Sequence, residues 1–129
     1  MKALILQNAS HEGAGTIEDY FKKNNIAYTT VDLSKKGYKI PDPSGYNALI
    51  VMGGPMNVYE TNEFPYLIEE EKIIKTAIEK NYLVLGICLG AQMMAKALGS
   101  KVTKGKTKEI GWYDITLTDD GIEDKALGP

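Results

Sequence analysis

The sequence predicts an α/β domain in which helices cover both faces of a mostly parallel sheet. Short runs made almost wholly of apolar residues, such as Ala3–Leu6 and Ala48–Met52, are typical of strands that are buried on both sides. Longer segments with apolar residues at helical spacing separate these runs, as in proteins that alternate strands and helices. The chain has 129 residues, of which 43% are hydrophobic and 25% charged, and this is enough for one domain with a real core.

The first part of the chain predicts two strands, one helix and a long connection. The strand Ala3–Leu6 leads into a polar loop over residues 7–15, which contains two glycines. A helix is expected over Thr16–Asn25, where Thr16 can cap the first turn. The alternating, β-branched segment Ala27–Leu33 predicts a second strand, and the two prolines and two glycines of residues 34–45 predict a loop.

The middle of the chain predicts a strand, a tight turn, the longest helix and another strand. Ala48–Met52 runs directly into Gly53-Gly54-Pro55, which must be a turn. The helix is expected over Phe64–Asn81, and the buried strand Tyr82–Ile87 follows it. The helix residues expected to face the core are Leu67, Ile68, Ile74, Ala77 and Ile78.

The last part predicts a short helix over Gly90–Leu98, with Gly99 as its C-terminal glycine. Further strands are expected at Lys101–Thr103 and Trp112–Thr118, with Trp112 as a packing anchor. Parallel sheets carry their sites in loops at the carboxyl ends of the strands. The loops of that kind lie at residues 7–15, 53–59 and 88–90.

Charge and cysteine content exclude several classes of protein. The net charge is −2 with 15 basic and 17 acidic residues, so we expect no nucleic-acid partner. The densest lysine group is interpreted as a solvated loop or edge strand and comprises Lys101, Lys104, Lys106 and Lys108. The single cysteine can form no intrachain disulfide, which fits a reduced, cytoplasmic setting. No apolar stretch is long enough for a signal peptide or for a membrane span.

The most informative stretch places Gly86-Ile87-Cys88-Leu89-Gly90 between a predicted strand and a predicted helix. This Gly-x-Cys-x-Gly pattern is the cysteine version of the nucleophile elbow, a sharp turn that presents a reactive side chain. The flanking glycines remove side chains that would collide as the strand packs under the helix. Cys88 would lie at a helix N-terminus, where the dipole favours a thiolate. We therefore interpret Cys88 as a nucleophile rather than as a buried structural cysteine.

A second turn supports that interpretation. Gly53-Gly54-Pro55 ends another buried strand, and it can aim a backbone N–H at the corner where Cys88 lies. The N–H of Leu89, the residue after the nucleophile, is its natural partner. Two such donors form an oxyanion hole for the intermediate of an acyl transfer. In isolation the same residues would be interpreted as a simple turn.

Three motifs together resemble the class I (triad) glutamine amidotransferases, especially stand-alone proteins similar to the amidotransferase domain of GMP synthase. The motifs are Met52–Met56, Gly86–Gln92 and Glu109–Trp112. The resemblance implies a doubly wound, flavodoxin-like fold that hydrolyses the side-chain amide of L-glutamine through a cysteine thioester. It implies Cys88 as the nucleophile, Gly54 and Leu89 as the oxyanion-hole donors, and Gln92 as a residue that lines the substrate pocket. It implies no cofactor and no metal, and in the wider family the ammonia passes to a synthetase partner.

The chain departs from the family pattern in one respect. The family's triad needs a histidine and a glutamate in a His-x-Glu segment downstream of the cysteine, but no histidine follows Cys88 here. We therefore expect residues 1–129 to be the N-terminal part of one amidotransferase-like domain, incomplete at its C-terminus and inactive alone. The only histidine, His11, is interpreted as a loop residue rather than as the base. An incomplete sheet exposes a strand edge and apolar surface, so self-association as a homodimer is also expected.

Two alternatives stay open. The same fold and cysteine elbow serve γ-glutamyl hydrolases and related peptidases, which would change the substrate but not the chemistry. The residues Gln92 and Glu109–Trp112 favour amidotransfer over that alternative. The missing triad partners favour instead a non-catalytic binding module built on the same fold.

Overall fold

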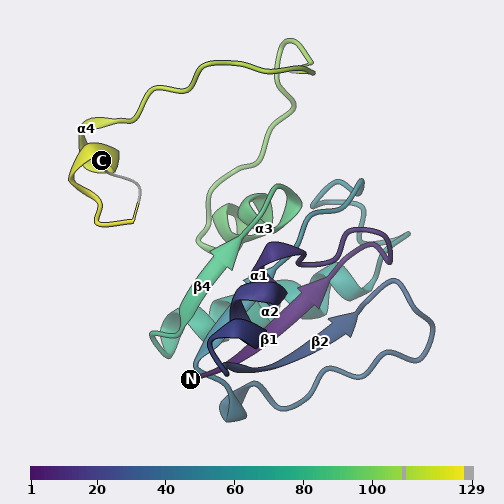
Figure 1. The fold of residues 1–129 in the computed structure, drawn as a ribbon. Coiled ribbons are helices and arrows are strands. Elements are labelled where there is room, and N and C mark those ends of the chain that lie inside the picture. The colour runs from purple at the N-terminus through teal and green to yellow at the C-terminus, as the bar shows by residue number, and fades with distance from the viewer. Residues whose placement is uncertain (109, 127–129) are drawn as a thin grey trace.

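The computed structural model describes residues 1–108 and 110–126, and it confirms the predicted α/β class (Figure 1). Four strands form one sheet in the order β2-β1-β3-β4, and each neighbouring pair is parallel. The strands are β1 (Lys2–Gln7), β2 (Ala27–Asp32), β3 (Ala48–Val51) and β4 (Leu83–Gly86). The helices are α1 (Thr16–Lys23), the 3-10 helix η1 (Pro43–Gly45), α2 (Tyr66–Glu79), α3 (Leu89–Ala97) and α4 (Asp119–Glu123).

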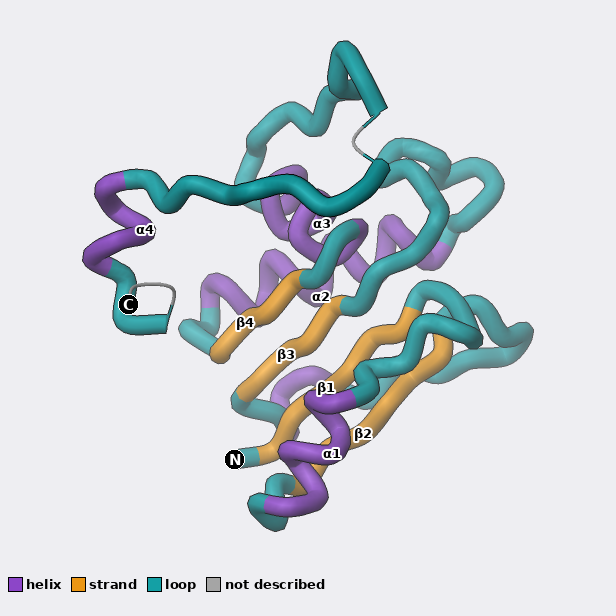
Figure 2. Tube along the Cα trace, turned by 45° about the horizontal axis from the view of Figure 1, so that its top comes forward, coloured by secondary structure: helices purple, strands orange, loops and turns teal. Residues whose placement is uncertain are grey.

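Helices lie on both faces of the sheet, with α1 on one side and α2 and α3 on the other (Figure 2). Successive side chains of a strand point to opposite faces. Accordingly, Ala3 and Ile5 of β1 belong to the cluster that includes Phe21 of α1, whereas Leu4 and Leu6 belong to the cluster on the α2 and α3 side. The near-continuous apolar runs of the central strands are explained by this burial on two sides.

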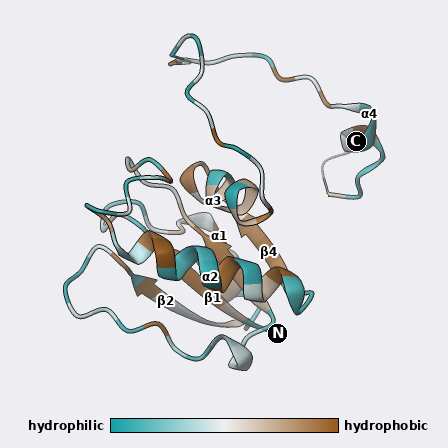
Figure 3. Cartoon of the chain, turned by 180° about the vertical axis from the view of Figure 1, so that it is seen from behind, coloured by the Kyte–Doolittle hydropathy of each residue, from teal (hydrophilic) through white to brown (hydrophobic). Residues whose placement is uncertain are grey.

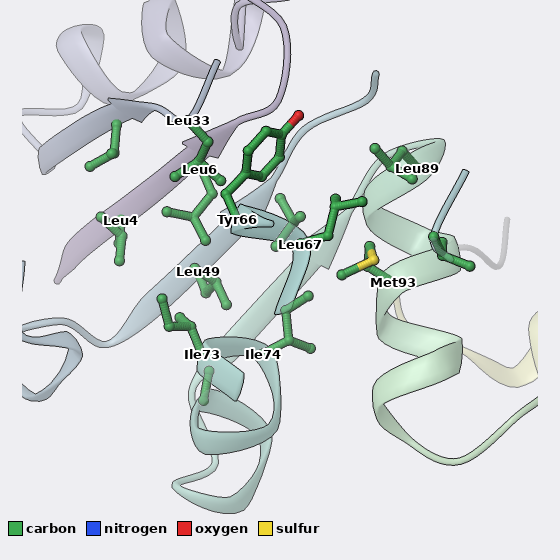
Figure 4. Close-up of a cluster of buried hydrophobic side chains, with 14 of the residues drawn as sticks. Leu4, Leu6, Leu33, Leu49, Tyr66, Leu67, Ile73, Ile74, Leu89 and Met93 are labelled. Atoms are coloured by element: carbon green, nitrogen blue, oxygen red, sulfur yellow. The ribbon is translucent and has the colours of Figure 1, made fainter. Parts of the chain in front are cut away.

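The larger core cluster lies between the sheet and the helices α2 and α3 (Figure 4). Leu67 and Ile74 of α2 are fully buried there, and Met93 of α3 packs beside them. Apolar and polar stretches alternate along α2, as Figure 3 shows from the side of that helix. The expectation that Ile68 faces the core is wrong, because its position lies off the buried stripe and it is 47% exposed.

The strand order creates a switch point between β1 and β3. The chain leaves β1 towards β2 on one side, and it leaves β3 towards β4 on the other. Loops that diverge in this way leave room at the carboxyl ends of the two strands, which is where open α/β sheets bind their ligands. The loops after β1, β3 and β4 therefore meet at one edge of the sheet.

The two strands predicted after α3 are wrong. Among the described residues, neither Lys101–Thr103 nor Trp112–Thr118 forms a strand, and this part of the chain extends away from the sheet (Figure 1). Trp112 is fully exposed and does not act as the predicted packing anchor, while Ile115 is 88% exposed. A strand is stable only when it pairs with a neighbour and covers an apolar layer. The local pattern favoured strands, but the pairing partners do not lie beside them in this structure.

The helix ends agree with the sequence at some positions and differ at others. Gly99 ends α3 as predicted, with φ of 88° and an N–H that donates to the Lys96 carbonyl oxygen at 2.9 Å. Thr16 is wrong as a cap, because Gly15 occupies the cap position and Thr16 is the first helical residue. The helix α4 was not predicted, and the side chain of Thr118 caps it by accepting a hydrogen bond from the Gly121 N–H at 3.1 Å.

The strand β4 forms one edge of the sheet. Its apolar side chains Leu83 and Leu85 are 67% and 47% exposed. They align with Ala48 and Ile50 of β3, so they point to the face that α1 covers further along the sheet. Self-association through this edge stays a prediction. Among the described residues, no helix is both long and apolar enough to span a bilayer.

Candidate active site

Cys88 lies at the corner between β4 and α3, at the position that the elbow pattern predicts. Its φ is 53° and its ψ is −111°, a backbone conformation that costs roughly 1–3 kcal/mol in a residue other than glycine. Backbone hydrogen bonds hold the corner, since the Ile87 N–H donates to the Val51 carbonyl oxygen at 2.9 Å and the Gln92 N–H donates to the Cys88 carbonyl oxygen at 3.1 Å. The Cys88 side chain is exposed, as a nucleophile must be.

The two glycines of the elbow are required by close packing. A Cβ atom on Gly90 would collide with the carbonyl oxygen of Val51 at the end of β3. A Cβ atom on Gly86 would lie 2.6 Å from the Gly90 carbonyl and 2.6 Å from Met94 Sδ. The absence of these side chains lets α3 start directly above β4, and this sharp turn is what exposes Cys88.

The Gly53-Gly54 turn lies directly beside the elbow. A Cβ atom on Gly53 would lie 3.5 Å from the Cβ of Cys88, and one on Gly54 would lie 3.2 Å from Leu89 Cδ2. Leu89 is the first residue of α3, and the first N–H groups of a helix have no acceptor within it. The structure therefore brings together the three backbone positions from which the sequence predicts a nucleophile and an oxyanion hole.

Gln92 occupies the first turn of α3, four residues after Cys88. Its side chain is exposed, and its backbone belongs to the hydrogen-bonded corner of the elbow. One helical turn separates it from Cys88, which places it at the rim of the candidate site. Its role as a residue that lines the substrate pocket stays a prediction.

The loop after β1 brings His11 and Glu12 to the same edge. The Glu12 Oε2 atom lies 2.8 Å from the position of a Cβ on Gly53, the same point that lies close to Cys88. The His11 Nε2 atom lies 3.7 Å from Glu12 Oε1, and the imidazole is 79% exposed. The carboxylate, rather than the imidazole, is therefore the group that lies close to Gly53 beside Cys88.

A buried polar cluster lies beneath the turn. The Asn8 side chain donates from Nδ2 to the Met52 carbonyl oxygen and to Glu70 Oε1, both at 3.1 Å, and the Tyr66 hydroxyl donates to the Asn8 carbonyl oxygen at 3.2 Å. Asn8 and Glu70 are both 0% exposed. Burial raises the pKa of the Glu70 carboxyl group to about 7, although the hydrogen bond from Asn8 opposes this rise. Burial also raises the pKa of the Tyr66 hydroxyl to about 12, with a smaller contribution from Glu70.

The sequence interpretation missed Asn8 and Glu70. A signal was available for Glu70, because it lies at helical spacing from Leu67, Ile74 and Ala77 on the buried face of α2. A charged residue at such a position is rarely buried without a partner. Asn8 gave a weaker signal, because it is only one of several polar residues that follow the apolar run of β1.

The described residues of the third sequence motif, 110–112, do not add to the site. Glu109 lies outside the described residues, and Ile110 and Trp112 are exposed at 80% and 103%. The lysine group around Lys104 is exposed in a loop, as its alternation with small residues predicts. An open groove beside β2 is lined by residues such as Asp32, and its lining includes neither Cys88 nor the Gly53-Gly54 turn.

Fold and elbow together define an α/β domain of the nucleophile-elbow kind. Its residues 11–125 match the family model described as glutamine amidotransferase class-I. The chain therefore belongs to the class I glutamine amidotransferase family, as the motifs predict. It is 40% identical over 85 residues to the glutamine amidotransferase-like protein YfeJ of Salmonella typhimurium. The aligned residues cover 64% of this chain and 36% of that relative.

Two further comparisons agree with this family. A GMP synthase (glutamine-hydrolyzing) of Caldanaerobacter subterraneus is 35% identical over 86 residues, which is 67% of this chain and 15% of the relative. The crystal structure of a glutamine amidotransferase from Thermotoga maritima superposes with a TM-score of 0.80 at 37% identity, over 88% of this chain and 50% of the other. This chain thus spans half or less of the length of these relatives.

Proposed function

We propose that Cys88 is the nucleophile of a glutaminase reaction, in which the protein hydrolyses the side-chain amide of L-glutamine to glutamate and ammonia. The observation that carries the proposal is the placement of Cys88 in a left-handed backbone conformation against the Gly53-Gly54 turn. Strain of this kind persists where the surroundings impose it, and it is concentrated at functional sites. Membership of the class I glutamine amidotransferase family supports L-glutamine as the substrate.

In the proposed reaction the Cys88 thiolate attacks the side-chain carbonyl carbon of glutamine, and the carbonyl oxygen becomes an oxyanion. The N–H groups of Gly54 and Leu89 would donate hydrogen bonds to that oxygen. In enzymes with such an oxyanion hole, the removal of one donor typically lowers kcat about 10²–10³-fold. The C–N bond then breaks, and the nitrogen leaves as ammonia after it takes a proton from a general acid. Water then attacks the thioester and the C–S bond breaks, which releases glutamate and the thiolate; one proton restores the general acid and the other converts ammonia to ammonium.

The chain supplies only part of this machinery. His11 is its single histidine, and that side chain pairs with Glu12 at the rim of the site. We propose that residues 1–129 form the nucleophile half of one amidotransferase domain and that turnover needs a base from outside them. By analogy with the GMP synthase relative, we also propose that the ammonia passes to a synthetase. A free thiol as nucleophile fits a reducing compartment such as the cytoplasm.

The test uses the intact gene product and the variant Cys88→Ser. We expect glutamate release from L-glutamine to fall at least about 10³-fold, because a serine hydroxyl gives up its proton far less readily than a thiol and is a far weaker nucleophile than a thiolate. A diazoketone analogue of glutamine should label wild type at Cys88 once per chain and leave the variant unlabelled. Equal glutamate release by the two proteins would refute the proposal.

The same assay separates the alternatives. Faster hydrolysis of γ-glutamyl peptides than of free glutamine would identify a γ-glutamyl hydrolase of the same fold. Failure of the folded wild type both to label and to release glutamate would instead support a binding module.

A further inference from the structure

The buried face of α2 contains one charged residue. Its other buried members are Tyr66, Leu67, Ile73, Ile74 and Ala77, and Glu70 is as completely buried as Leu67 and Ile74. An apolar side chain at this position would continue the core. The Glu70 carboxyl group instead meets Asn8, which follows β1 and is equally buried. The pair lies under the switch point of the sheet, on the inner side of the candidate active site.

Hydrogen bonds hold both the side-chain amide and the backbone carbonyl group of Asn8. The two hydrogens of its Nδ2 atom are directed to the Met52 carbonyl oxygen and to Glu70 Oε1, each at 3.1 Å. The Tyr66 hydroxyl donates to the backbone carbonyl oxygen of Asn8 at 3.2 Å. The side chain therefore has one orientation, in which it links the end of β3 to the middle of α2.

The carbonyl group that Asn8 holds belongs to the peptide between Met52 and Gly53. On the other side, the Met52 N–H donates to the Leu6 carbonyl oxygen at 2.9 Å. Beyond that peptide come two glycines in succession, and glycine restricts the backbone least of all residues. The hydrogen bond from Asn8 thus fixes the last peptide plane before the Gly53-Gly54 turn that lies against Cys88 and Leu89.

We infer that Asn8 and Glu70 are positioning residues, which hold the Gly53-Gly54 turn in the orientation that an oxyanion hole beside Cys88 requires. This inference rests on the proposed function. Asn8 sets the direction of the Met52 carbonyl group, and Glu70 sets the direction of the Asn8 amide. Neither side chain touches the reacting atoms.

The arrangement is costly for stability, which favours a role in the site. Within the described residues, Asn8 Oδ1 and Glu70 Oε2 are buried without a hydrogen-bond partner. Burial also raises the pKa of the Glu70 carboxyl group to about 7, which reflects the penalty on its charged form. Buried polar groups with such penalties are uncommon in cores and are frequent at functional sites.

The experiment compares Asn8→Ala, Glu70→Leu and Glu70→Gln in the intact gene product, with glutamate release from L-glutamine as the readout. We expect kcat to fall roughly 10- to 100-fold in Asn8→Ala and Glu70→Leu, with KM within about threefold of wild type, because a misplaced donor weakens transition-state binding more than substrate binding. Glu70→Gln keeps an oxygen acceptor for Asn8 and should recover most of the activity that Glu70→Leu loses. Glu79→Leu, at an exposed position near the end of α2, is the control and should retain full activity.

A second readout separates positioning from a general loss of structure. Alkylation of Cys88 by iodoacetamide displaces iodide at a saturated carbon and needs no oxyanion hole, so its rate should stay within about threefold of wild type in folded variants. If Asn8→Ala does not fold, the pair of Glu70 variants decides. Unchanged kcat in folded Glu70→Leu, or equal losses in Glu70→Leu and Glu70→Gln, would overturn the inference and leave the proposed function intact. A wild-type protein that releases no glutamate would overturn both.

Discussion

Replacement of Glu70 by glutamine should remove a large pH dependence from the stability of the fold. The pKa of this carboxyl group rises from its ordinary value of 4.5 to about 7 on folding, because burial disfavours its charged form. The difference between these two values, at about 1.36 kcal/mol for each pH unit, corresponds to about 3 kcal/mol. Glu70→Gln cannot ionise and should therefore escape this loss.

The sign follows from linkage between protons and folding. Below pH 4.5 the group is protonated in both the folded and the unfolded chain, so it adds no pH dependence there. Between pH 4.5 and about pH 7 the unfolded chain releases the proton more readily, and the free energy of unfolding falls as pH rises. Above about pH 7 the loss is complete. The stabilising effect of a protonated Glu70, relative to its ionised form, is therefore present in acid and lost towards neutral pH.

The assay is urea denaturation of wild type, Glu70→Gln and the control Glu79→Gln at several pH values from 4.5 to 8. Glu79 lies on the same helix but is exposed, so its variant should follow wild type. The carboxyl groups of Asp32, Asp42 and Glu71 have lowered pKa values because of their hydrogen bonds, and they are common to all three proteins. Between pH 4.5 and pH 8, the gap between Glu70→Gln and wild type should widen by about 3 kcal/mol in favour of the variant. A gap that does not change with pH would refute the conclusion that the Glu70 carboxyl group is buried and has a raised pKa.

Two further predictions concern packing. Gly90→Ala should lower the free energy of unfolding by roughly 1–3 kcal/mol, because its Cβ would collide with the Val51 carbonyl oxygen. Ala91→Gly, at the exposed next position of α3, should cost only about 1 kcal/mol by denaturation. Equal effects would contradict the close-packed elbow. Leu67→Ala should lower the free energy of unfolding by about 2–5 kcal/mol in the same measurement, because Leu67 is 0% exposed. Ile68→Ala should cost well under half as much, because Ile68 is 47% exposed. Similar losses in the two variants would contradict the burial assigned to α2.

The elements that could be predicted from the sequence are those whose pattern is local. β1 and β3 are recognisable because burial on two sides requires an apolar residue at every position of a short run. The elbow is recognisable because the collision at Gly90 excludes every other residue from that position. The strand pattern depends only on residues that are close in the sequence. The elbow pattern depends on a strand-to-helix junction whose geometry recurs in many proteins, so its glycines can be recognised from the sequence.

The features that could not be predicted depend on pairs of distant residues. Asn8 and Glu70 are 62 positions apart, and their hydrogen bond exists only because β1 and α2 are packed together. Neither residue alone indicates the other. The segment Trp112–Thr118 shows the opposite error, since it alternates like a strand but has no partner beside it among the described residues. Strand formation is decided by pairing, which propensity does not reveal.

The geometry of the first loop argues that His11 is not the base of the proposed reaction. In a working triad the imidazole contacts the nucleophile, and the carboxylate lies behind it to hold its orientation. Here Glu12 Oε2 lies 2.8 Å from the position of a Cβ on Gly53, beside Cys88, whereas the His11 ring is 79% exposed and lies 3.7 Å from Glu12 Oε1. This arrangement agrees with the proposal that Cys88 is the nucleophile and that its base comes from outside these 129 residues.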